Sequence, residues 1–277
     1  MNKNHLKHLN EFEDLNYTRM DNKIKKTAIA AAKKAGELAL REYKNFDRAA
    51  VKLKSRHDIV TKVDLASEKI IINEIKSNFP EHRILSEEAG QTINKSDYLW
   101  IIDPIDGTTN FSMHNPIWSI SIGLAFKNEI IFGIIYAPCL GELFMAEKGK
   151  GAKLNDKKIS ASKIKDGKVL NAFCHSSKEK DIKKAIKYFS YQKLHGLDCR
   201  QMGSAAIELA YVACGRIESI VIPGANSWDV AAGALMVREA GGRVTDFLGR
   251  PWQIKSRNIA ASNGLVHKNI LKVLKGL

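Results

Sequence analysis

The spacing of apolar residues predicts several amphipathic helices in this chain. In the first half, apolar side chains recur every three or four residues along an Ala- and Lys-rich stretch, 22–43, and again over 65–78. The second half contains four more stretches of this kind. They begin after Lys178, cover 204–214, begin after Asp229 and begin at Leu265.

Shorter apolar runs, rich in isoleucine and valine, predict strands between these helices. The two longest runs, 117–126 and 130–136, are expected as buried strands, although they could also serve a dimer interface. Several consecutive strands interrupted by helices predict a mixed α/β fold in layers with a large mixed sheet. The other strands are expected near Ile84, over 99–102, 143–147, 169–173 and 217–222, and near Val244 and Ile259.

Length and composition bound the domain organisation. With 277 residues, 44% of them hydrophobic, the chain can bury a large core in one or two domains. We expect residues 1–21 to form a polar leader that is poorly ordered or loosely packed, with metal binding by His5 and His8 as an alternative role. No repeat, Pro-rich linker or low-complexity block divides the rest. Residues 22–277 are therefore expected as a single unit whose halves, 22–150 and 151–277, contribute to one site.

Two features of the sequence predict a cytoplasmic protein. No apolar run approaches the ~18 residues of a transmembrane helix, and residues 1–21 are too polar for a secretory signal, so no membrane partner is expected. The four cysteines show neither Cys-x-x-Cys spacing nor a phosphate-cradling loop around them. We expect structural thiols and no phosphocysteine at Cys139, Cys174, Cys199 and Cys214.

The charge of the chain is strongly positive and admits three interpretations. Forty-four basic against thirty acidic residues give a net charge of +14. The lysines could simply be solvated, or they could attract anionic phosphorylated substrates. Alternatively, the protein binds RNA or the transcription machinery, with catalysis secondary. The basic segments 151–158 and 181–187 lack interleaved aromatic residues, which favours an enzyme over a nucleic-acid-binding module.

The segment 103–109, Asp-Pro-Ile-Asp-Gly-Thr-Thr, carries the most specific chemistry. It follows the apolar run 98–102, so Asp103 ends a predicted buried strand and Asp106 lies three residues later. Gly107 and Thr108 then open a short helix. Two carboxylates beside a helix N-terminus could bind a divalent cation together with a phosphate. Taken alone, the segment could equally be an Asx turn.

Further carboxylates occur at the boundaries of predicted elements. Asp64 lies near the start of a helix, Glu87 and Glu88 follow a strand, and Asp229 opens a helix rich in small residues. Each one alone is most simply a helix cap or a solvated charge. Their joint occurrence with the 103–109 segment predicts a shared site.

This set of residues resembles the signature of the lithium-sensitive, magnesium-dependent phosphatase superfamily. Within it, the chain most resembles the bacterial inositol monophosphatases, from about residue 24 to the C-terminus. The resemblance implies an α-β-α-β-α sandwich, a homodimer and inhibition by lithium. Besides the carboxylates, it rests on segments 58–64, 110–111, 116–123, 133–138, 147–152 and 200–205, and on Trp228-Asp229 placed eleven residues before Gly241-Gly242.

The resemblance implies a site for two or three Mg²⁺ ions. Glu87, Asp103 and the backbone carbonyl of Ile105 would hold the first ion. Asp103 would bridge to a second ion, which Asp106 and Asp229 would also bind. A carboxylate site without His or Cys suits Mg²⁺ better than Zn²⁺.

The resemblance also implies catalytic and substrate-binding residues. Asp64 and Thr108, with Glu87 nearby, would orient the attacking water. The backbone N–H groups of Gly107 and Thr108 would receive the phosphate. The remaining substrate contacts would come from Asp106, Ser204 and Ala205.

The implied activity is hydrolysis of phosphomonoesters by direct attack of a metal-activated water, without a covalent phosphoenzyme. Inositol-1-phosphate, or another small polyol or sugar phosphate, is the expected substrate. One position departs from the family pattern, because Ile222 stands where many members have a Glu that binds a substrate hydroxyl. An apolar side chain cannot accept that hydrogen bond. This change makes a 3′(2′),5′-bisphosphate nucleotidase of the same superfamily the alternative.

Overall fold

The structure, a computed structural model, describes the backbone of residues 3–45, 52–55, 58–60, 62–166 and 168–276. Side chains are described for residues 22–45, 62–166 and 168–276. His5 and His8 lie outside the residues with described side chains, so their predicted alternative role stays a prediction.

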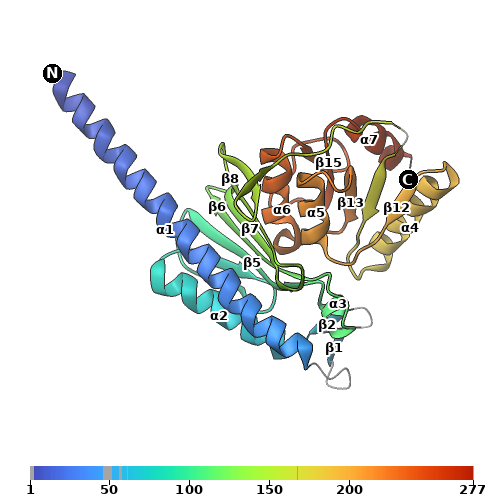
Figure 1. Ribbon diagram of the computed structural model, residues 1–277, viewed down its shortest axis with the longest axis horizontal. Coiled ribbons are helices and arrows are strands. Elements are labelled where there is room, and N and C mark those ends of the chain that lie inside the picture. The colour runs from blue at the N-terminus through green and yellow to red at the C-terminus, as the bar shows by residue number, and fades with distance from the viewer. Residues whose placement is uncertain (1–2, 46–51, 56–57, 61, 167, 277) are drawn as a thin grey trace.

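Helices and sheets alternate through the molecule in five layers (Figure 1). Helices α1 (Lys3–Lys44) and α2 (Lys62–Asn78) cover the outer face of an eight-stranded sheet. Helices α5 (Ala205–Ala213) and α6 (Ser227–Glu239) fill the space between this sheet and a five-stranded sheet. Helices α4 (Glu179–Leu194) and α7 (His267–Lys275) cover the second sheet from outside. The predicted α-β-α-β-α sandwich is confirmed.

The eight-stranded sheet is antiparallel except where β3 pairs with β5. Its order is β10-β9-β8-β7-β6-β5-β3-β4. A separate hairpin of β1 (Lys52–Ser55) and β2 (Asp58–Val60) precedes it. The strands are β3 (Arg83–Ser86), β4 (Gly90–Gln91), β5 (Tyr98–Asp106), β6 (Ser119–Phe126), β7 (Glu129–Ala137), β8 (Glu142–Glu147), β9 (Gly151–Leu154) and β10 (Lys157–Ile159).

The five-stranded sheet is mixed, with order β12-β11-β13-β15-β14. Strands β12, β11 and β13 run parallel, and β15 pairs antiparallel with both β13 and β14. Two short helical turns, α3 (Thr108–Ser112) and η2 (Pro138–Leu140), complete the described elements. The strands are β11 (Leu170–Phe173), β12 (Asp198–Arg200), β13 (Ser219–Pro223), β14 (Arg243–Thr245) and β15 (Asn258–Ser262).

Strand β5 is buried on both faces because helices cover both sides of its sheet. Trp100 and Ile102 face α1 and α2, whereas Leu99 and Ile101 face α5 and α6. Successive side chains of a strand point to opposite faces, so a continuous apolar run is what such a position requires. The runs 117–126 and 130–136 likewise lie within this chain's own core as β6 and β7.

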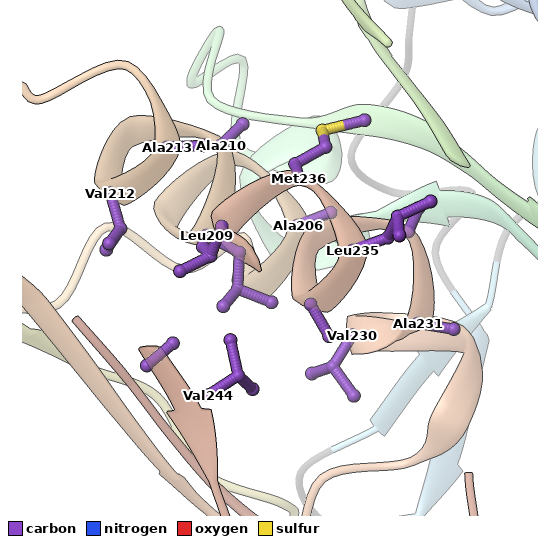
Figure 2. Packing of buried hydrophobic residues seen from close by; sticks show 14 of the residues in the cluster. Ala206, Leu209, Ala210, Val212, Ala213, Val230, Ala231, Leu235, Met236 and Val244 are labelled. Carbon is purple, nitrogen blue, oxygen red and sulfur yellow. The ribbon is translucent and has the colours of Figure 1, made fainter. Parts of the chain in front are cut away.

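Helix α6 packs closely because its residues are small. A Cβ at Gly233 of α6 would lie 2.5 Å from Leu209 Cβ of α5. Figure 2 shows the small and apolar side chains of the two helices in one cluster. On the other side, a Cβ at Gly133 of β7 would lie only 2.9 Å from the Cα of Ala232. The small-residue sequence after Asp229 thus permits close contact with a helix and a sheet at once.

Helix α1 begins nineteen residues earlier than periodicity predicts, at Lys3 instead of residue 22. Residues 3–21 contain neither Pro nor Gly, so nothing in their sequence ends the helix. In Figure 1 this segment extends away from the layered body of the molecule. The backbone of 3–21 is therefore helical, and the leader role of residues 1–21 stays a prediction.

No helix in the described part of the chain is long and apolar enough to cross a membrane.

Candidate functional site

A β-bulge in β5 brings Asp103 and Asp106 to the same side of the sheet. Asp103 pairs with Ser121 of β6, and Asp106 pairs with Ser119. The two pairs are thus three residues apart along β5 but only two residues apart along β6. Residues three apart in a regular strand point to opposite faces, and one extra residue reverses that relation. The strand thus continues through Pro104 beyond the end predicted at Asp103. Both carboxylates are almost fully buried.

Asp64 lies in the first turn of α2 and contacts the segment after β5. Thr108 Oγ1 is 3.1 Å from Asp64 Oδ1 and 3.0 Å from the carbonyl oxygen of Ile105. Gly107 adopts a left-handed conformation (φ 92°), and a Cβ there would lie 3.0 Å from the Ile117 carbonyl oxygen. A glycine is therefore required for this turn.

Glu87 is positioned by a residue that the sequence did not single out. It follows β3, and its N–H donates to the carbonyl of Ile102 at 3.2 Å. The buried Glu68, one turn after Asp64 in α2, accepts hydrogen bonds from Ser86 Oγ and from the N–H groups of Glu88 and Ala89. Only the spacing Asp64-x-x-x-Glu68, which places both acids on one helix face, could have indicated this role.

Residues of the C-terminal half fix the side chain of Asp106 by hydrogen bonds. Ser204 Oγ and the Ala206 N–H (3.0 Å) both donate to Asp106 Oδ2. Ser204 is also the N-cap of α5, accepting from Ile207 N, and it is buried. The structure thus places Ser204 as a support for Asp106, while Ala205 lines the cavity described below.

Asp229 enters the site from α6, which begins at Ser227 and thus before the start that was predicted after Asp229. The Asn226 N–H donates to Asp229 Oδ2 at 2.8 Å as part of a capping box. Arg257 donates to Asn226 Oδ1 (2.9 Å) and to the Gly224 carbonyl (3.2 Å). The capping box thus fixes Asp229 Oδ2, and Arg257 holds Asn226 in place.

A cavity of about 260 Å³ joins these groups. Its lining contains four carboxylates together with the cationic side chains of Lys178 and Arg257. Ile222 and Ala225 form part of its wall, so the apolar substitution predicted from the sequence does face the site. The lining includes Glu87, Asp103, Ile105, Asp106, Gly107, Thr108, His175, Gly203, Ala205, Asn226 and Asp229.

Burial and mutual repulsion raise the pKa values of the acids. Burial, and then the charges of Glu87, Asp106, Asp229 and Asp64, raise the pKa of Asp103 well above its ordinary range. Burial raises the pKa of Asp106 to about 6, against the lowering effect of its bonds to Ser204 and Ala206. Burial and the Asp106 charge raise the pKa of Asp229 to about 7. Such a cluster of buried like charges is stabilised by a bound cation.

The donor set fits Mg²⁺ in its chemistry. Within the described residues, no three His, Cys, Asp or Glu side chains form a ready-made cage for an ion. Mg²⁺ does not need one, because it usually keeps several waters and completes its shell with substrate phosphate. The acids at the cavity all offer oxygen atoms as ligands. Asp103 lies close enough to the other four acids for their charges to raise its pKa.

The cysteines agree with the expected structural role. All four are free. Cys174 lines the cavity, but burial and the nearby charges of Glu208 and Asp106 raise the pKa of its thiol well above the ordinary value. A thiol in that state is a poor nucleophile.

Comparisons with known proteins identify the family of this chain. The inositol monophosphatase family model matches residues 20–276. A curated relative, Nus factor SuhB of Pasteurella multocida, is 39% identical over 251 residues, covering 90% of this chain and 94% of the relative. Nus factor SuhB of Escherichia coli K12 is also 39% identical over 251 residues, covering 88% and 92%.

Solved structures show the same architecture. The SuhB protein of Bartonella henselae superposes with a TM-score of 0.84 at 34% identity, covering 91% of this chain and 98% of that one. An IMPase of Thermotoga maritima gives a TM-score of 0.82 at 36% identity, covering 94% and 97%. The sequence pattern, the fold and the site geometry thus agree, and the chain belongs to the inositol monophosphatase family.

Proposed function

We propose that this protein is a Mg²⁺-dependent phosphomonoester hydrolase acting on inositol phosphate or other small polyol and sugar phosphates. The observation that carries the proposal is that four acids from β5, α6 and the segment after β3 line one cavity, while Asp64 of α2 contacts Thr108 of the same lining. Membership of the inositol monophosphatase family supports a phosphatase. Glu87, Asp103, Asp106, Asp229 and the Ile105 carbonyl would hold two or three Mg²⁺ ions.

The pair Asp64 and Thr108 is suited to hold and deprotonate the attacking water. The Thr108 hydroxyl has one proton. It can therefore donate one full hydrogen bond, either to Asp64 or to the Ile105 carbonyl. When it bonds to Ile105, Asp64 is able to accept a proton from the water. The water oxygen then bonds to phosphorus as the ester P–O bond breaks, and the leaving alkoxide takes up a proton. Mg²⁺ would supply charge neutralisation and a lowered water pKa.

The test is phosphate release from a panel of substrates with Mg²⁺ and with Mg²⁺ plus lithium. The panel contains inositol-1-phosphate, β-glycerophosphate, fructose-1,6-bisphosphate and 3′-phosphoadenosine-5′-phosphate. We expect Mg²⁺-dependent, lithium-inhibited release with inositol-1-phosphate preferred over the adenosine bisphosphate; the reverse ranking would favour the nucleotidase alternative.

Replacement of the bridging carboxylate tests the site itself. We expect Asp103→Asn to abolish measurable phosphate release, because it removes a ligand that both ions share. Asp97→Asn, which alters an exposed acid near the start of β5, is the matched control and should keep full activity. Substantial activity in Asp103→Asn would contradict the assignment.

A second candidate function follows from the names of the relatives. They are called Nus factors, and this chain carries a net charge of +14. We therefore keep the alternative of a protein that binds RNA or the transcription machinery, with secondary phosphatase activity. The absence of phosphate release from every substrate, with folded protein and Mg²⁺, would favour this alternative. RNA binding that weakens steeply with added salt would also favour it.

A homodimer also stays a prediction, which light scattering on the purified protein would test.

A further inference from the structure

A second large cavity is lined by residues of the eight-stranded sheet, of α6 and of the segment 243–255. Its volume is about 860 Å³, within the ~300–1,000 Å³ typical of small-molecule pockets. None of the described residues lines both this cavity and the one that contains Asp103 and Asp229. The proposed hydrolysis therefore makes no use of it.

The buried part of the lining is apolar. Leu99, Ile130, Val244 and Trp252 belong to the core between the two sheets, and Leu85 packs against the same core. A ligand with an apolar body would cover this surface and remove it from water, which a fully polar ligand would not do. The cavity thus suits a ligand that is apolar on one side.

The more exposed part of the lining is basic. It presents the side chains of Lys127, Arg243 and Lys255, which are exposed, and of Arg83 and Arg238, which are partly exposed. Cations of this kind beside an apolar surface favour a ligand that carries a negative charge at one end.

These five cations lack carboxylate partners. The lining contains one acid among the described residues, Glu129, which forms an ion pair of 2.6 Å with Lys148 outside the cavity. In the described part of the chain, no carboxylate forms an ion pair with any of the five cations. Their positive charge is therefore left for an external anion.

Arg238 is the cation best placed to bind such an anion. Its Nη2 donates to the Trp252 carbonyl at 2.7 Å, which holds the guanidinium beside the apolar wall. A guanidinium has five N–H donors, and this is the one hydrogen bond that the side chain makes within the described residues. Burial lowers the pKa of Arg238, against the raising effect of the Glu129 charge. A fixed, partly buried guanidinium with free donors is suited to a carboxylate, phosphate or sulfonate group.

Helix α6 contributes to both cavities. Ser227, at its start, lines this cavity, and Asp229, two residues later, lines the candidate metal site. Arg238 follows Ser227 by eleven residues, or about three helical turns, so the two lie on one face of α6. A ligand in this cavity therefore contacts the helix that carries a proposed metal ligand without entering the metal site.

We propose that this cavity binds a small organic anion and that the bound anion is an effector of the metal site. The anionic group binds Arg238 and Arg243, and an apolar or aromatic body lies against Trp252. The ligand restrains the start of α6 at Ser227, so Asp229 is held in place and Mg²⁺ binds more tightly. The effector role rests on the proposed Mg²⁺-dependent function, whereas the binding site itself does not.

The experiment uses naphthalene-2-sulfonate as the probe, because it is an aromatic anion without a phosphate ester. Calorimetric titration of the full chain without Mg²⁺ should give a Kd of about 1 mM or tighter. Naphthalene-2-sulfonamide, which is neutral, and methanesulfonate, which has no aromatic body, are the matched controls. Each should bind about tenfold more weakly or not measurably.

Two variants test the position of the site. Arg238→Gln and Arg243→Gln should each weaken binding of the sulfonate about five- to tenfold. Arg243 is exposed, so its variant tests the proposal even if Arg238→Gln fails to fold. The control is Lys184→Gln, which removes a cation from a different cavity beside α4 and α7 and should keep the Kd. Absence of binding, or an equal Kd in both arginine variants, would overturn the proposed site.

Mg²⁺ titrations with and without saturating sulfonate, at constant ionic strength, test the effector role. We expect the sulfonate to lower the Kd of Mg²⁺ about fivefold, and by linkage Mg²⁺ should lower the Kd of the sulfonate by the same factor. Equal Mg²⁺ affinities in the two conditions would overturn the effector role. If Mg²⁺ binds in neither condition, the proposed function fails, whereas sulfonate binding that is weakened in Arg238→Gln and Arg243→Gln would still support the site.

Discussion

At the scale of single residues, Glu68 holds the segment that carries Glu87, a proposed metal ligand, in place. Its Oε1 accepts three hydrogen bonds from the segment 86–89, which carries Glu87 between them. Glu68 does not line the cavity. Because a carboxylate with three donors is well fixed, it restrains the segment without touching the substrate. Glu68 is therefore a positioning residue.

We predict that Glu68→Ala raises the Mg²⁺ concentration for half-maximal activity about tenfold, as is common when support for a metal ligand is removed. Glu68→Gln keeps an acceptor oxygen and should restore most of the affinity. The control is Glu74→Ala in the same helix, since Glu74 bonds to the exposed Lys34. Activity is titrated with Mg²⁺ for each variant. A variant that is only destabilised would show less total activity at the same half-maximal Mg²⁺ concentration. Equal half-maximal Mg²⁺ concentrations for Glu68→Ala and Glu74→Ala would refute the positioning role of Glu68.

At the scale of elements, the contact between β7 and α6 depends on the absence of a side chain. A Cβ at Gly133 would lie 2.9 Å from Ala232 Cα and 3.0 Å from its carbonyl oxygen. Gly123 pairs with Gly133 across β6 and β7, but a Cβ there would lie an ordinary 3.4 Å from Ala231 Cβ. Two glycines opposite each other in the sheet thus face the same helix with different clearance.

This difference predicts unequal costs for the same substitution. We expect Gly133→Ala to lower the free energy of unfolding by about 1–3 kcal/mol, because backbone atoms of α6 must move. Gly123→Ala should lower it by less than about 1 kcal/mol. Urea denaturation of both variants measures the two values. Equal losses would mean that α6 can shift on the sheet at little cost.

Elements with strong apolar periodicity were predictable, and polar edge elements were not. The buried β5, β6 and β7 match the runs at 99–102, 117–126 and 130–136, because burial on both faces demands apolar residues. Strand β10 has two lysines in its three residues and is exposed, so it carries no such signal. The start of α1 was also missed, since residues 3–21 lack an apolar stripe comparable to 22–43.

The acids of the candidate site could be named from the sequence, but their contacts could not be predicted. Carboxylates at element ends indicated Asp64, Glu87, Asp103, Asp106 and Asp229, and four of them line one cavity. The β5 bulge could not be foreseen, because it depends on pairing with β6. Nor could the pairing of Arg257 with Asn226 be foreseen, since 31 residues separate them.

At the scale of the whole molecule, the proposed metal site joins the two halves of the chain. Asp103 and Asp106 come from the first half, Asp229 comes from the second, and Ser204 of the second half bonds to Asp106. Asn110 adds a bridge, donating to the carbonyls of Ile117 and Met202 at 2.7 Å each. Without a cation, the buried carboxylates at this junction repel one another, which opposes folding.

We therefore predict that Mg²⁺ stabilises the whole fold. A ligand at about 100 times its Kd adds about 2.7 kcal/mol when it binds only the folded state, and here it also relieves the repulsion. Asp103→Asn removes one buried charge. Without metal, this variant should therefore melt at a higher temperature than the natural protein. The increase in its melting temperature on adding Mg²⁺ should be smaller. Asp97→Asn, at an exposed position, should reproduce the natural protein in both states. Calorimetric melts with and without saturating Mg²⁺ provide the comparison. If the natural protein melts at one temperature in both conditions, the carboxylates do not bind the ion. If Asp103→Asn lowers the metal-free melting temperature, the hydrogen bond from Ile105 N to Asp103 Oδ1 outweighs the repulsion, and the acids are held together by their bonds to the backbone.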